Sequence, residues 1–102
     1  MKNLNVETQQ NHLSLEGALR ATDAIKFKPQ LLDRIKASNN NYTIDISRVE
    51  QIDITGLNSL IMAKKYSNQI GRNLTILANE NNPIFELVHL TKFGKFIDIQ
   101  LV

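Results

Sequence analysis

Asp53 and Thr55 are the side chains whose types and spacing suggest regulated chemistry. They lie in residues 52–57, IDITGL, between an alternating apolar run and a long amphipathic segment. A strand should therefore end and a helix begin here, and both residue types can accept a hydrogen bond from the first free N–H groups of a helix. Those N–H groups and the helix dipole favour negative charge, so this end would also tolerate a phosphate on the threonine hydroxyl.

The same residues resemble a family signature. IDITGL is similar to the Asp-Ser-Ser-Gly-Leu motif of STAS domains, in particular the bacterial anti-sigma factor antagonists, with Thr55 at the position of the phosphorylated serine. The resemblance extends over residues 12–19, which include Gly17, and over residues 42–47, 71–77 and 90–96. It implies a small sheet with helices packed on it.

Length and composition predict one domain over residues 1–102. With 42% hydrophobic residues, a chain of 102 can bury one modest core. It contains no Cys, which excludes disulfides and thiolate catalysis. The N-terminus lacks an apolar signal region, and no stretch approaches the roughly 20 apolar residues of a membrane span. We therefore expect a cytoplasmic protein without direct membrane insertion.

Charge and motif content argue against several activities. The net charge is +2, but the lysines and arginines are scattered, so no nucleic-acid partner is expected. His12 and His89 are isolated, and there is no glycine-rich phosphate loop, so we expect no metal, no cofactor and no enzymatic activity. Asp53 could instead be a receiver phosphoacceptor, but the acidic pair that would hold Mg²⁺ after the first strand is missing.

Hydrophobic periodicity predicts an α/β fold with a small mixed sheet of about five strands and three or four helices. Strands are expected at residues 4–8, 11–15 (running on to Gly17), 42–47, 74–77 and 97–101. Helices are expected at residues 28–38 with Pro29 in the first turn, at 56–70 closed by Gly71, and from Pro83 to near Gly94. Val49 and Ile52 are placed in a loop.

The helix predicted at residues 56–70 has two sides at 100° per residue. The side expected to face the sheet carries Leu57, Leu60, Ile61 and the stem of Lys64. The roughly opposite side carries Thr55, Ser59, Met62 and Tyr66. Of these, Met62 and Tyr66 form either an adaptable docking surface or the cover of a neighbouring helix. The residues predicted to bind a partner are Asp53, Ile54, Thr55, Gly56, Asn58, Ser59, Met62 and Tyr66.

The STAS resemblance implies a protein-binding switch. The unphosphorylated chain would bind an anti-sigma factor with a serine/threonine kinase domain, phosphorylation of Thr55 would release it, and a serine/threonine phosphatase would restore binding. Asp53 would orient the hydroxyl or contact the partner. One alternative is that Thr55 only caps its helix.

Another alternative is a STAS subunit of a lipid ABC transport complex, bound constitutively to an ATPase subunit. In those subunits the hydroxyl often follows the aspartate directly, whereas Ile54 occupies that place here. The antagonist interpretation is therefore preferred.

Overall fold

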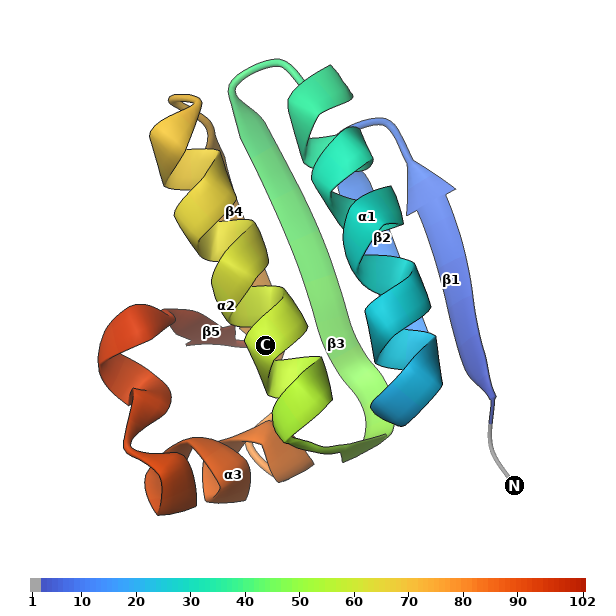
Figure 1. Cartoon of the computed structure of the whole chain (residues 1–102), viewed down its shortest axis with the longest axis vertical. Coiled ribbons are helices and arrows are strands. Elements are labelled where there is room, and N and C mark those ends of the chain that lie inside the picture. The colour runs from blue at the N-terminus through green and yellow to red at the C-terminus, as the bar shows by residue number, and fades with distance from the viewer. Residues whose placement is uncertain (1–2) are drawn as a thin grey trace.

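A computed structural model describes residues 3–102, which form five strands, three α-helices and one short 3₁₀ helix (Figure 1). In chain order these are β1 (Leu4–Gln9), β2 (His12–Leu19), α1 (Ala21–Ala37), β3 (Asn41–Ile52), α2 (Ile54–Gln69), β4 (Asn73–Ala78), α3 (Pro83–Thr91), η1 (Phe93–Phe96) and β5 (Ile99–Leu101). The predicted α/β class is confirmed. Residues 1 and 2 of the predicted domain lie outside the described residues.

The strands follow one another across the sheet in the order β1-β2-β3-β4-β5. β1 pairs with β2 as an antiparallel hairpin, and every later pair is parallel. Parallel neighbours need a crossover, which α1, α2 and the α3–η1 segment provide. The carboxyl ends of β2 and β3 therefore lie at one edge of the sheet, where α1 and α2 begin.

One face of the sheet carries the core. In β3 the side chains of Tyr42, Ile44 and Ile46 are buried, while the alternate residues between them are only partly covered. The helices α1 and α2 lie side by side over the buried face (Figure 1). The predicted half-exposed strand is thus confirmed.

β2 and β3 are both longer than predicted. Val49 is buried and pairs with Gly17, and the ladder continues until Leu19 pairs with Ile52, so the loop prediction for Val49 and Ile52 was wrong. Gly17 has a φ of 99° at a register shift between the strands. This glycine conformation lets β2 continue past the irregularity where the sequence suggested an end.

α1 begins at Ala21, seven residues before the predicted start, so Pro29 lies inside the helix and not in its first turn. Proline lacks the N–H that would bond to the carbonyl of Ile25. Both residues are on the exposed side of the helix, where water can hydrate that carbonyl.

No helix among residues 3–102 is both long and apolar enough to span a membrane.

Tyr42 is a core residue with an unpaired polar atom. Its side chain is 2% exposed, and its buried hydroxyl has no hydrogen-bond partner within residues 3–102. We expect Tyr42→Phe to raise the free energy of unfolding by up to about 1 kcal/mol near neutral pH, because an unsatisfied buried hydroxyl is destabilising. Urea unfolding followed by circular dichroism measures this difference.

The same variant should respond differently to alkali. Burial raises the pKa of Tyr42 above its ordinary value of 10.0, and the Arg34 guanidinium partly opposes this effect. The native state therefore holds the phenolic proton more tightly than the unfolded chain, so this contribution to stability is present below pH 10 and is lost as the pH rises further. The stability advantage of Tyr42→Phe should grow above about pH 10, and a constant difference across the alkaline range would contradict this.

Candidate functional site

Asp53 joins the starts of two helices. It is the N-cap of α2, where its Oδ1 accepts a hydrogen bond of 2.9 Å from the Gly56 N–H. Its Oδ2 accepts a second hydrogen bond, of 3.0 Å, from the Ala21 N–H at the start of α1. Ala21 takes part through its main chain, with a φ of 50°, so its side chain gave no signal in the sequence.

Thr55 lies at the second position of α2 and does not cap it. Its side chain is half-buried, and its hydroxyl forms no hydrogen bond within the part of the chain that the structure describes. The alternative in which Thr55 only caps the helix is wrong, because Asp53, the other candidate cap, occupies the N-cap. Asp53 has no hydrogen bond to this hydroxyl among the described residues, and its two carboxylate oxygens accept from backbone N–H groups instead. Its contact with a partner stays a prediction.

A row of exposed side chains runs along α2 from this end. Ile54 is 47% exposed and Met62 is 36% exposed, with the exposed Asn58 between them. Residues four apart on a helix lie nearly above one another, so these three form one row, and Thr55 is adjacent to its first member. We call Ile54, Thr55, Asn58 and Met62 the α2 face.

Of the residues predicted to contact a partner, two are buried by the protein itself and a third is partly covered. Gly56 is buried, and a Cβ added there would lie 2.0 Å from the Leu19 carbonyl oxygen. Ser59 is 2% exposed and donates a 2.6 Å hydrogen bond to the Gly56 carbonyl. Tyr66 is half-buried against the core.

The burial of Gly56 and Ser59 contradicts the prediction that a partner contacts their side chains, whereas contact with the partly exposed Tyr66 stays a prediction. The physical reason is that α2 is covered on two sides. It packs on the sheet and also against α1, so its buried stripe is wider than one apolar row and includes the small residues Ser59, Ala63 and Ser67.

Two substitutions of Asp53 should destabilise the fold to different extents. Asp53→Ala removes both accepted hydrogen bonds and should lower the free energy of unfolding by about 2 kcal/mol. Asp53→Asn keeps an oxygen for the Gly56 N–H but offers no second acceptor to Ala21, so its loss should be about 1 kcal/mol. Urea unfolding of wild type and the two variants tests this order of stability. Equal stability of wild type and Asp53→Ala would contradict a stabilising role for the two hydrogen bonds that Asp53 accepts.

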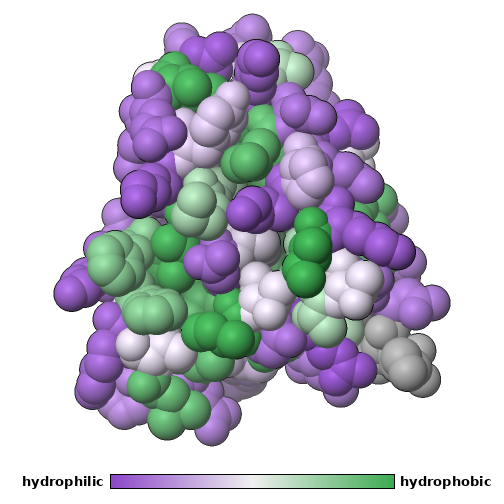
Figure 2. Space-filling view, viewed as in Figure 1, coloured by the Kyte–Doolittle hydropathy of each residue, from purple (hydrophilic) through white to green (hydrophobic). Residues whose placement is uncertain are grey.

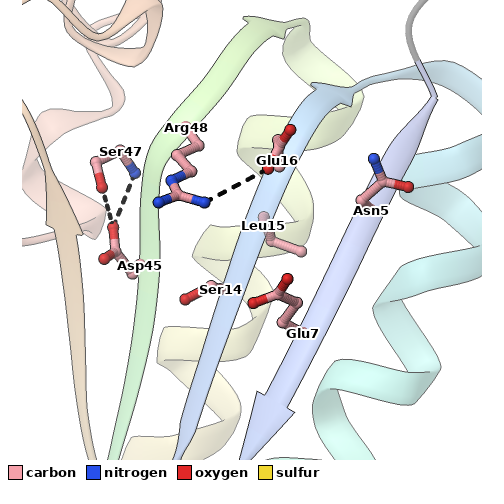
Figure 3. Close-up of a pocket in the computed structure, with 8 residues that line it drawn as sticks. All are labelled: Asn5, Glu7, Ser14, Leu15, Glu16, Asp45, Ser47 and Arg48. Atoms are coloured by element: carbon pink, nitrogen blue, oxygen red, sulfur yellow. Dashed lines mark hydrogen bonds and ion pairs between the residues drawn. The ribbon is translucent and has the colours of Figure 1, made fainter.

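The open face of the sheet holds a polar hollow of about 170 Å³ (Figure 3). Asp45 accepts hydrogen bonds from the backbone N–H and the hydroxyl of Ser47. Arg48 lies 3.7 Å from Glu16 in an ion pair whose side chains are 76% and 52% exposed, which contributes little to stability. Within residues 3–102, no three His, Asp or Glu side chains cluster as metal ligands. Four of the polar residues of the hollow thus interact in two pairs, and the hollow shares no residue with the α2 face.

A family model described as "Mlab, STAS domain" matches residues 3–102. The chain therefore belongs to the STAS domain family, as the signature at residues 52–57 suggested. No curated protein matches the sequence.

Solved structures share this fold at low sequence identity. An anti-sigma factor antagonist from Mycobacterium paratuberculosis has a TM-score of 0.75 and 19% identity, with 97% of this chain and 85% of that chain covered. The anti-sigma factor antagonist SpoIIAA in its unphosphorylated form has a TM-score of 0.66 and 9% identity, covering 98% and 87%. A chain in the complex of the diguanylate cyclase SiaD with its activator SiaC from Pseudomonas aeruginosa has a TM-score of 0.63 and 14% identity, covering 100% and 89%.

Proposed function

We propose that this protein is an anti-sigma factor antagonist, a non-enzymatic binding module of the cytoplasm whose affinity for its partner is controlled at Thr55. The observation that carries the proposal is the half-buried Thr55, whose hydroxyl has no hydrogen bond within residues 3–102 and which lies beside exposed Ile54 at the start of α2. The STAS family and its antagonist structural neighbours agree with this function. The partner is an anti-sigma factor with a serine/threonine kinase domain.

The position of Thr55 suits a reversible charge switch. The first N–H groups of α2 have no partner within the helix, and with the helix dipole they favour a phosphate at the second helical position. Modification would place a charge of about −1.5 to −2 on the α2 face, where it would have to be desolvated under a bound partner. Phosphorylation would abolish binding without unfolding the protein, and a serine/threonine phosphatase would restore binding.

The direct test uses purified protein and the kinase-type anti-sigma factors encoded in the same genome. Incubation with ATP and Mg²⁺ should add one phosphate, and peptide mapping by mass spectrometry should place it on Thr55. Calorimetry should then show binding by the unmodified form and none by the phosphorylated form. Phosphate on another residue, or equal binding of both forms, would contradict the proposal.

A second candidate is a STAS subunit of a lipid ABC transport complex. The matching family model is described as "Mlab, STAS domain" and names no anti-sigma factor, so the family match is compatible with this alternative as well. In that role the α2 face would hold an ATPase subunit permanently, without phosphorylation. Stable co-purification with an ATPase and a permease, unaffected by incubation with kinase and ATP, would select it over the antagonist function.

A further inference from the structure

We infer that a groove between α2 and η1 binds an acidic amphipathic helix of the partner protein. This inference rests on the proposed function, because it assigns the chemistry of the partner that the α2 face would bind. The groove has a volume of about 490 Å³ and is lined by Asn58, Ile61, Met62, Lys64, Lys65, Asn68, Phe93, Lys95 and Phe96. We call it the α2–η1 groove.

The α2–η1 groove combines apolar walls with basic edges. Met62 is 36% exposed and Phe96 is 51% exposed. The rings of Phe93 and Phe96 pack edge to face, with their centroids 6.0 Å apart. Figure 2 shows apolar residues gathered over the lower part of α2, α3 and η1, interrupted by hydrophilic ones. A methionine and phenylalanines at a surface form an adaptable apolar contact area.

The charged residues lining the groove all carry the same sign. Lys64, Lys65 and Lys95 line it, and no acidic residue does so within residues 3–102. The Lys64 ammonium donates a 2.9 Å hydrogen bond to the Leu74 carbonyl, while the Lys95 ammonium lies 5.1 Å from the centroid of the Phe96 ring. An occupant therefore needs acidic side chains flanking an apolar strip.

The shape of the groove favours a helical occupant over an extended one. Its walls come from α2 and η1, whose backbones are hydrogen-bonded within each helix, so no strand edge is offered to an extended peptide. The lining residues of α2 run from Asn58 to Asn68, about 15 Å of helix, which matches about three turns of a bound helix.

The groove also adjoins the proposed switch. Asn58 and Met62 belong both to its lining and to the α2 face. Thr55 and Met62 are about 10 Å apart along the helix axis. A phosphate on Thr55 would therefore face one end of an acidic helix in the groove, and repulsion between them would lower its affinity.

The test uses a defined probe. A fluorescein-labelled peptide of about three helical turns, with leucines three and four residues apart and glutamates elsewhere, is titrated with the full chain and followed by anisotropy. A matched peptide carries lysine at every glutamate position. We expect the acidic peptide to bind and the lysine peptide not to bind, with amide NMR shifts at Asn58, Met62 and Phe96.

Charge reversal gives the matched controls. Lys65→Glu with Lys95→Glu changes two exposed groove lysines and should weaken binding of the acidic peptide by roughly tenfold or more. Lys26→Glu with Lys36→Glu makes the same change on the exposed side of α1 and should alter binding less than about twofold. Equal binding of both peptides, shifts elsewhere, or tighter binding of a DNA oligonucleotide would overturn the inference.

The two hypotheses can fail separately. Suppose that an anti-sigma factor binds the wild-type protein, that phosphorylation of Thr55 abolishes this binding, and that the charge reversal at Lys65 and Lys95 does not change it. The groove inference then fails and the proposed function stands. If the acidic peptide binds in the groove but phosphorylation of Thr55 does not affect any anti-sigma factor, the proposed function fails and the groove assignment stands.

Discussion

Thr55→Glu should reduce affinity for the anti-sigma factor at least about 100-fold, which corresponds to about 2.8 kcal/mol, while the free energy of unfolding changes by less than about 1 kcal/mol. The loss of affinity follows from the place of the new carboxylate. It would lie beside exposed Ile54, inside the surface that the partner must desolvate. The fold should tolerate the change, because a negative charge near the start of a helix is favourable.

Two further variants make this experiment specific. Thr55→Ala removes the phosphoacceptor without adding charge, so it should bind the partner in the presence of kinase and ATP. Thr8→Glu makes the same substitution at an exposed threonine of β1, which pairs with Leu13 near the beginning of β2, far from the edge where α2 starts. Calorimetry should find Thr8→Glu equal to wild type, and a Thr55→Glu protein that binds as tightly as wild type would refute the switch.

Gly56→Ala should lower the free energy of unfolding by about 3 kcal/mol, and for a chain of this size the melting temperature should fall by roughly 15 °C. The added Cβ would lie 2.0 Å from the Leu19 carbonyl oxygen and 3.0 Å from the Ile52 side chain. The first contact is with backbone at the end of β2, so α2 must move away from the sheet to relieve it. Such a shift would also displace Thr55, so binding should weaken in the fraction that remains folded.

Gly71→Ala is the matched control for Gly56→Ala. Gly71 has a φ of 72°, and an added Cβ would have no atom within 4 Å. Its N–H and that of Arg72 donate to the carbonyls of Asn68 and Ser67, which closes α2 as the sequence predicted. Only backbone strain of about 1 kcal/mol is expected there. Urea unfolding compares the two variants, and a Gly56→Ala protein as stable as Gly71→Ala would contradict the steric role of Gly56.

Local patterns predicted the position of the candidate site but not its surroundings. Asp53 was identified as a possible cap because its type and its place between two periodic segments are local information. Its second hydrogen bond, to Ala21, joins residues 32 positions apart and has no local signature. Pro29 was misplaced for a related reason, since the length of α1 depends on a buried stripe that continues past an exposed proline.

The residue types of α2 did not show how much of the helix would be covered. The helical period placed Ser59 on the side away from the sheet, yet it is buried because α2 also packs against α1. Its hydroxyl donates to the carbonyl of Gly56. Phe96 and Lys95 are far from α2 in the chain and gave no signal for a site, although η1 places them beside Met62. Such neighbours depend on how the crossovers pack.

The sequence by itself determined the order of elements, the α/β class, the helix start at residues 52–57 and the closure at Gly71, because alternation, capping chemistry and glycine conformation act over a few residues. The tertiary structure decided which sides of α2 remain open. Gly56 is covered by the carbonyl of Leu19 and Ser59 is buried, whereas Ile54 and Met62 stay exposed. The reason is that burial is set by contacts between segments distant in the chain, which a local period cannot encode.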